Sequence, residues 1–198
     1  MNYLAHAHLS FNHPHILVGN MISDFVKGKK QFDYPDLVHK GIQLHRAIDN
    51  FTDTHKTTQQ IKIFFKPQYR LYAGAFTDVV YDHFLANDTS EFITDDSLKQ
   101  FALLTYQVLE ANFEVLPQNF QKMLPYMTAH NWLYNYKSRL GIQKSFAGLV
   151  RRSSYLTESD IAFEIFNEHY KTINSLYHDF YPDIKKFAAH HLQQLLNA

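Results

Sequence analysis

The chain has 198 residues, thirteen histidines, no cysteine, and nineteen basic against nineteen acidic residues, so its net charge is zero with histidine neutral. This charge argues against a general nucleic-acid-binding protein, and the absence of cysteine excludes thiolate catalysis, disulfides and cysteine-ligated zinc. No run of about 18 apolar residues predicts a membrane span, and the N-terminus lacks the basic region of a signal peptide, so we expect a soluble cytoplasmic protein.

Apolar residues recur with helical spacing along most of the sequence, and only six glycines and six prolines interrupt them. No Asn-Gly or Asp-Gly pair offers a tight hairpin turn. The length is that of one domain with a substantial core. The sequence thus predicts an all-α protein, a helical bundle in which residues 1–198 form a single domain.

The first two predicted elements carry polar side chains among apolar ones. Residues 2–11 form a short, largely buried helix or extended segment that contains His6 and His8. These histidines are either metal ligands or core residues bonded to backbone carbonyls. Residues 15–27 form a helix in which Asp24 has apolar neighbours on both sides. A carboxylate in these surroundings is difficult to place in water.

The central predicted helix, residues 35–52, carries the strongest signal. On a helical wheel of about 100° per residue, His45 and Asp49 lie one turn apart in the middle of the face that should be buried. A buried carboxylate without a partner is costly, so Asp49 needs a cation. A metal ion is the obvious candidate beside an imidazole.

A helix at residues 55–65 precedes a second informative helix at residues 68–87. This second helix is apolar nearly all round, yet Asp78 and Asp82 share one stripe. Like charges one turn apart repel unless a cation or a proton lies between them. A metal ion would relieve both, and a shared proton is the weaker alternative. His83 points away from this stripe, and we expect it to bond a carboxylate or a backbone carbonyl.

The rest of the chain predicts further helices without a second polar cluster. They cover residues 96–115, one or two short helices within 118–139 around Pro125, 141–152, and a long helical region at 158–196 broken at Pro182. The adjacent pair His178-Asp179 resembles the metal-binding pair of HD phosphohydrolases. It lies late in the chain on a helix of mostly polar spacing, so we exclude it from the site.

Taken together, the candidate side chains mix imidazole and carboxylate, contain no sulfur and come from four segments: His6, His8, Asp24, His45, Asp49, Asp53, Asp78 and Asp82. Facing helices of a bundle build metal sites from inward side chains of this kind. The set suits Mn²⁺, Fe²⁺, Mg²⁺ or Zn²⁺. Such a site typically activates water and neutralises the charge of a phosphoryl group. Arg46 could clamp a phosphate oxygen, and Arg151 and Arg152 are weaker candidates for that task.

Several blocks of this sequence resemble the acyl carrier protein phosphodiesterase family. In order along the chain they are Met1–Leu9, Gly19–Val26, Gly41–Asp49 with Thr52-Asp53, and Asp78–Leu85. The resemblance continues more loosely through Trp132, Tyr136 and the stretch Gly148–Arg152, so it covers most of the chain. Tyr81, where the family pattern leads us to expect tryptophan, is a conservative departure.

The resemblance implies a distantly HD-domain-like helical fold with the metal site between central helices, and a Mn²⁺-dependent hydrolase. Its reaction would cleave the phosphodiester that joins 4′-phosphopantetheine to a serine of holo acyl carrier protein, giving apo carrier protein and 4′-phosphopantetheine. Typical HD enzymes have adjacent His and Asp, whereas His45 and Asp49 here are one turn apart. The carrier protein is acidic as a class, so the basic loop Lys27–Lys30 or the pair Arg151-Arg152 could dock it.

On this interpretation the metal ligands come from the set His6, Asp24, His45, Asp49, Asp78 and Asp82. His8, Arg46 and Asp53 are expected to take part in catalysis, with His8 or a free carboxylate accepting a proton and Arg46 steadying the phosphate. Two alternatives stay open: a metal-dependent hydrolase of a nucleotide or other small phosphoester, and a non-catalytic helical protein that binds carrier protein. The sequence specifies no oligomeric state.

Overall fold

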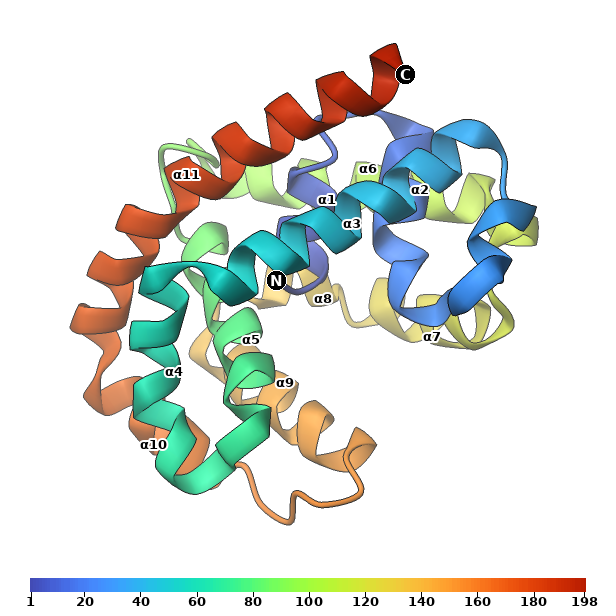
Figure 1. Ribbon diagram of the computed structural model, residues 1–198. Helices are drawn as coiled ribbons and strands as arrows, with labels where there is room; N and C mark the ends of the chain where they lie inside the picture. The colour runs from blue at the N-terminus through green and yellow to red at the C-terminus, as the bar shows by residue number, and fades with distance from the viewer.

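The computed structural model of residues 1–198 contains eleven α-helices, four short 3-10 helices and no strand, which confirms the all-α prediction (Figure 1). The α-helices are α1 (Tyr3–His8), α2 (Pro14–Ile22), α3 (Asp36–Thr54), α4 (Lys56–Tyr69), α5 (Ala73–Ala86), α6 (Asp95–Ala111), α7 (Gln118–Ala129), α8 (Trp132–Asn135), α9 (Arg139–Arg152), α10 (Asp160–Glu168) and α11 (Tyr170–Asn197). The 3-10 helices are η1 (Ser23–Phe25), η2 (Gly28–Asp33), η3 (Arg70–Tyr72) and η4 (Phe113–Val115).

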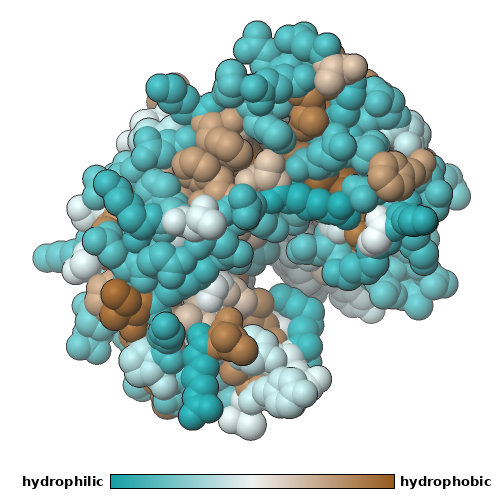
Figure 2. All heavy atoms as spheres, viewed as in Figure 1, coloured by the Kyte–Doolittle hydropathy of each residue, from teal (hydrophilic) through white to brown (hydrophobic).

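Helix α3 crosses the middle of the molecule and packs against α2, α4 and α11, while the short helix α1 packs against α2 and α5 (Figure 1). One continuous hydrophobic core takes residues from every α-helix. The space-filling view shows a largely hydrophilic face that is hollowed between the positions of α7 and α9 (Figure 2). None of the helices combines the length and apolar character needed to cross a membrane.

The predicted break at Pro182 is wrong. Helix α11 continues through this proline to Asn197, and the break falls earlier, at His169 between α10 and α11. A proline in a helix interior removes one backbone hydrogen bond and disfavours the helix. Here Tyr177, Phe180 and Ile184 are buried on both sides of the proline, and this packing holds the helix together, because most helical stability in proteins comes from tertiary contacts.

His83 on α5 is a structural histidine of the core, 2% exposed. Its Nδ1–H donates to the Tyr136 carbonyl over 2.8 Å, and the Tyr170 hydroxyl lies 3.1 Å from Nε2 as donor. The carbonyl partner confirms the sequence-based expectation. Both nitrogens are satisfied in the neutral ring, so a second proton would place a buried charge there and require the Tyr170 hydroxyl to change from donor to acceptor.

The burial of His83 predicts a loss of stability in acid. Burial lowers its pKa from 6.5 to about 4, so the unfolded chain takes up the proton first as the pH falls through this range. The free energy of unfolding should therefore fall between pH 6.5 and 4, by at most about 3 kcal/mol for this residue. Urea unfolding across that range should show a shallower fall for His83→Gln; equal slopes would contradict the prediction. Some slope should remain, because burial also lowers the pKa of His8 to about 4.

Candidate metal centre

Two histidines and one carboxylate from α1 and α3 converge in the middle of the molecule. His6, His45 and Asp49 each offer a ligand atom, and these three atoms lie within 4.8 Å of one another. His6 Nε2 is 3.1 Å from Asp49 Oδ1, and His45 Nε2 is 3.1 Å from Asp49 Oδ2. The two imidazole rings stack with centroids 3.9 Å apart. We call these three residues the His-Asp cluster.

Asn20, which the sequence analysis did not assign to the site, orients both imidazoles of the cluster. Its side-chain Oδ1 accepts from His6 Nδ1 over 2.8 Å, and its backbone carbonyl accepts from His45 Nδ1 over 2.7 Å. Its Nδ2 donates to the His6 carbonyl over 2.8 Å. The side-chain amide is fully buried, and both its oxygen and its nitrogen are hydrogen-bonded. A buried amide on an apolar helix face was the available signal for this role.

The close crossing of α2 and α3 brings Asn20 to His45. Gly19 and Gly41 face each other at this crossing, where a Cβ on Gly19 would lie 2.0 Å from the Val38 carbonyl oxygen and one on Gly41 would lie 2.3 Å from the Ile16 carbonyl oxygen. Only glycine permits backbones to approach this closely. Asn20 follows Gly19 directly and His45 follows Gly41 by one turn, so the crossing sets the distance between them.

The charges of the cluster are strongly coupled. Burial opposes protonation of His45, but hydrogen bonds with Asp24 and Asp49 prevail and raise its pKa to about 9. Burial would raise the pKa of Asp49, yet His6 and His45 hold it well below its usual value. Burial lowers the pKa of His6 to about 4. The carboxylates therefore require a positive charge at this point, which a proton on His45 or a divalent cation can supply.

The donor set of the cluster fits a metal ion. Both imidazoles use Nδ1 for an oxygen partner and direct Nε2 at the same carboxylate. A hydrogen bond from the other ring nitrogen is the usual support of a metal-bound histidine, because it fixes the tautomer and the ring orientation. Two imidazole nitrogens with carboxylate oxygens suit first-row divalent ions and Mg²⁺ or Mn²⁺.

Asp24 approaches the cluster from the solvent side. Its Oδ1 lies 3.3 Å from His45 Nε2, and 72% of its side chain is exposed. The predicted helix over residues 15–27, with Asp24 in apolar surroundings, is wrong at this residue, since α2 ends at Ile22 and Asp24 lies in η1. The change to a 3-10 turn rotates the carboxylate to the surface. His45 holds the pKa of Asp24 below its ordinary value through a hydrogen bond.

Asp78 and Asp82 contact the Met1 amine and the start of α1, respectively. Asp78 Oδ1 lies 2.9 Å from the α-amino group of Met1, which is also 3.5 Å from Asp49 Oδ1. Asp82 is fully buried and accepts backbone N–H bonds from the first turn of α1, at Asn2, Leu4 and Ala5. Burial raises its pKa to about 7 against these donors. An ammonium group and a helix N-terminus thus reduce the repulsion, and the raised pKa of Asp82 leaves part of its carboxyl protonated at neutral pH.

His8 points away from the cluster, although it is only two residues from His6. Its Nδ1 lies 2.7 Å from the Tyr181 hydroxyl and its Nε2 lies 3.5 Å from Glu91. The ring packs against Phe92. The structure does not bring His8 together with the other candidates. The excluded pair at residues 178–179 also lies apart, with the His178 ring 3.9 Å from Asp88.

Arg46 and Asp53 flank the cluster on α3 without joining it. The Arg46 guanidinium donates to Gln31 over 2.6 Å and to the Val26 carbonyl over 3.2 Å, which ties α3 to the segment that follows Asp24. Asp53 is exposed and pairs with Lys62 over 2.7 Å. Of the predicted site residues, the structure therefore gathers His6, Asp24, His45 and Asp49 most closely, with Asp78 linked to Asp49 through the Met1 amine.

The fold and the site define a class of protein: a helical protein with a buried imidazole–carboxylate centre open to solvent on one side. A sequence model described as "Acyl carrier protein phosphodiesterase" matches residues 1–184. The chain belongs to the acyl carrier protein phosphodiesterase family.

Curated proteins named acyl carrier protein phosphodiesterase are similar along nearly their whole length. The protein of Photorhabdus laumondii is 32% identical over 92% of this chain and 92% of its own. Those of Yersinia pestis and Klebsiella pneumoniae strain 342 are 30% and 31% identical, over 96% and 95% of this chain and 98% and 97% of their own. No solved structure matches with significance, so the HD-like relationship stays a prediction.

Proposed function

We propose that this protein hydrolyses the phosphodiester between 4′-phosphopantetheine and a serine of holo acyl carrier protein, releasing apo carrier protein and 4′-phosphopantetheine. The observation that carries this proposal is the family match over residues 1–184. That range includes every side chain of the His-Asp cluster together with Asn20 and Asp24. The cluster offers the polar, solvent-accessible centre that hydrolysis of a charged diester requires.

We further propose that His6, His45 and Asp49 hold a divalent metal ion, Mn²⁺ in the first place, with Mg²⁺, Fe²⁺ or Zn²⁺ as alternatives. Asp24 lies close enough to His45 Nε2 to complete the set from the solvent side. When bound, such an ion neutralises charge on the diester and makes a water molecule more acidic. Asn20 keeps both imidazoles in the tautomer that leaves Nε2 available.

The residues around the cluster have separate tasks in this proposal. Asp24 has a lowered pKa and is ionised at neutral pH, and only its Oδ1 faces His45, so Oδ2 is available to accept a proton from water. Arg46 uses two N–H groups for Gln31 and Val26. A guanidinium has five N–H donors, so the remaining ones are available to hold a phosphate oxygen beside Asp24.

The carrier protein would dock on the basic surface next to Asp24. Lys27, Lys29 and Lys30 are exposed and have no ion pair within the protein. A loop is predicted for these lysines, but the segment from Gly28 forms η2. Unpaired cations at the entrance of a site attract an acidic protein and speed its association.

The test is intact-mass analysis of holo acyl carrier protein after incubation with this protein and Mn²⁺, with a chelator as control. We expect the carrier protein to lose the mass of 4′-phosphopantetheine only when metal is present. An unchanged mass with protein that demonstrably binds Mn²⁺ would reject the carrier protein as substrate and favour a small phosphoester. A loss of mass in the presence of chelator would reject metal dependence.

A further inference from the structure

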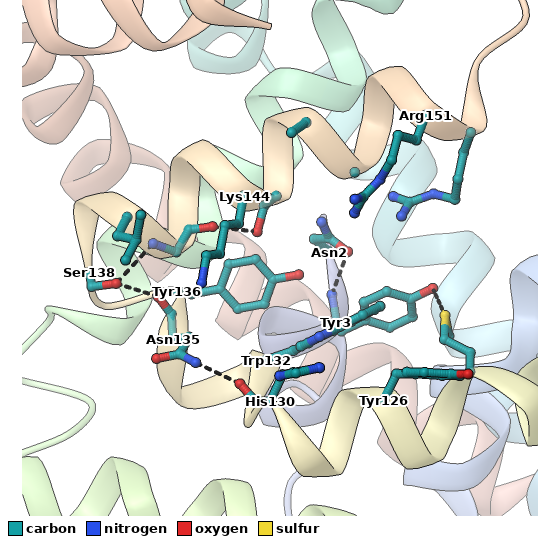
Figure 3. A pocket seen from close by; sticks show the side chains of 17 residues that line it. Asn2, Tyr3, Tyr126, His130, Trp132, Asn135, Tyr136, Ser138, Lys144 and Arg151 are labelled. Atoms are coloured by element: carbon teal, nitrogen blue, oxygen red, sulfur yellow. Dashed lines mark hydrogen bonds between the residues drawn. The ribbon is translucent and has the colours of Figure 1, made fainter.

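A cavity of about 630 Å³ lies between the N-terminal end of α1 and helices α7, α8 and α9 (Figure 3). Its volume is within the roughly 300–1,000 Å³ of small-molecule sites. No side chain of the His-Asp cluster lines it, but Asn2 and Tyr3 do, and His6 lies on the next turn of the same helix. The cavity and the cluster therefore lie along one short helix.

Unpaired cations gather at one wall of this cavity. Lys144, Arg151 and Arg152 line it from α9, and none of them has a hydrogen bond or an ion pair within the protein. Arg151 extends toward Asn2 (Figure 3). In a chain with balanced charges, three unpaired cations around one hollow indicate an anionic ligand, and guanidinium groups match phosphate well.

Gly148 keeps space open beneath the two arginines. A Cβ at this position would meet only the flexible ends of Arg152 and Arg151, at 3.4 and 3.9 Å. Glycine within a helix costs about 0.5–1 kcal/mol relative to alanine, and no backbone contact here requires it. The missing side chain leaves room for a ligand against α9.

The rest of the wall suits an extended chain with amide groups. Ser138 and Asn135 lie at the end of the cavity opposite Arg151, and Tyr136 and Trp132 lie between these ends (Figure 3). Ser138 Oγ already caps α9 by accepting from the Gly141 N–H, and Asn135 Nδ2 donates to the His130 carbonyl. Asn135 Oδ1 has no partner within the protein and can accept from an amide N–H of a ligand, and the aromatic rings cover the apolar parts of such a chain. The wall is long and mixed in polarity, rather than a compact apolar pocket.

Tyr3 connects the cavity to the cluster. It lines the cavity, its hydroxyl lies 3.6 Å from Met123 Sδ, and together with Asn2 it lies nearer to Arg151 than to Ser138 (Figure 3), at the start of the helix that carries His6. The basic end of the cavity is therefore the end nearer to the candidate metal centre. If a phosphate is held between the arginines and the candidate metal centre, an organic chain attached to that phosphate would extend into the cavity.

From these observations we propose that the cavity binds the 4′-phosphopantetheine arm, with its phosphate toward Arg151 and Arg152 and its amide chain running along α8 and α9 toward Ser138. This proposal rests on the proposed function, because that function supplies the arm. It adds a binding site for the prosthetic group that is separate from the docking surface of the carrier protein.

The first test measures binding of 4′-phosphopantetheine to the full-length protein with Mn²⁺ by isothermal titration calorimetry. Gly148→Leu fills the space beneath the arginines and should raise the Kd at least tenfold. Gln143→Leu, on the exposed face of the same helix, should leave it unchanged. An unchanged Kd in a folded Gly148→Leu variant would overturn the proposal. If that variant does not fold, Lys144→Glu at an exposed position of the wall should also raise the Kd, and an unchanged value there would overturn it equally.

A second experiment distinguishes the contribution of the phosphate to binding from that of the amide chain. Pantetheine, which lacks the phosphate, should bind more weakly than 4′-phosphopantetheine to the wild type. The double variant Arg151→Ala/Arg152→Ala should reduce that difference, while Lys171→Ala on α11 should preserve it. Inorganic phosphate that competes fully with pantetheine, or equal binding of both ligands to the wild type, would overturn the assignment of the phosphate to the arginines.

The two proposals fail in different ways. Hydrolysis of holo carrier protein with 4′-phosphopantetheine binding insensitive to Gly148→Leu would remove the arm site and leave the function. Binding that is lost in Gly148→Leu, without hydrolysis of holo carrier protein, would support the cavity as an arm site and reject the proposed reaction.

Discussion

Asp49→Asn should abolish Mn²⁺ binding and hydrolysis while leaving the fold intact. Asp49 is the residue that both imidazole Nε2 atoms approach, at 3.1 Å each, and asparagine preserves its size but removes the charge. Loss of a group that merely supports a ligand costs metal affinity about 10–100-fold, so loss of the central carboxylate should cost more than about 100-fold. Calorimetric titration with Mn²⁺ measures the affinity, and mass analysis of the carrier protein measures turnover.

Thermal unfolding provides the independent reading of this variant. A ligand that binds only the native state raises its melting temperature, so Mn²⁺ should stabilise the wild type and not Asp49→Asn. Asp36→Asn serves as the matched control, because Asp36 lies on the same helix, is exposed and pairs only with Lys40. Unaltered Mn²⁺ affinity in Asp49→Asn would refute the assignment of the cluster.

Gly41→Ala should destabilise the protein far more than an alanine in a helix ordinarily does. Alanine normally favours a helix over glycine by about 1 kcal/mol, but here the Cβ would lie 2.3 Å from the Ile16 carbonyl oxygen. The backbone of α2 must move away from α3, and we expect a loss of at least about 3 kcal/mol in the free energy of unfolding, the upper end of ordinary overpacking. Urea unfolding measures this change.

The same substitution should also weaken metal binding without touching a ligand. Separation of the helices moves the Asn20 carbonyl away from His45 Nδ1, a contact of 2.7 Å. Gly74→Ala on α5 is the control, since its Cβ would meet only the flexible end of Lys62 at 3.2 Å and stability should be kept or raised. If Gly41→Ala matched Gly74→Ala in stability, the close crossing would not be required.

Local patterns were sufficient for the helical class and for two buried polar positions on it. Helical spacing placed His45 and Asp49 on one buried face, and the structure holds them 3.1 Å apart. The apolar surroundings of His6 indicated a buried polar group, and it joins the same cluster. The first prediction succeeded because residues one helical turn apart face the same way in any tertiary context, and the second because apolar neighbours indicate burial.

The same reasoning failed where the answer depended on a distant partner. The stripe of Asp78 and Asp82 showed that positive charge was needed, but not that Met1 and the first turn of α1 would provide it. The exposed position of Asp24 followed from the early end of α2. Helix α11 crosses Pro182 because packing outweighs a local penalty.

By itself the sequence determined an all-α chain, the central His45–Asp49 pair and the resemblance that leads to the family. The tertiary structure decided which polar residues meet: the Gly19–Gly41 crossing brings Asn20 to His45, and α1 delivers His6 to Asp49. The physical reason is the separation along the chain of the residues that interact. Helical periodicity is fixed by neighbours a few residues apart, whereas the partner of a buried charge is chosen by the packing of segments far apart in the chain.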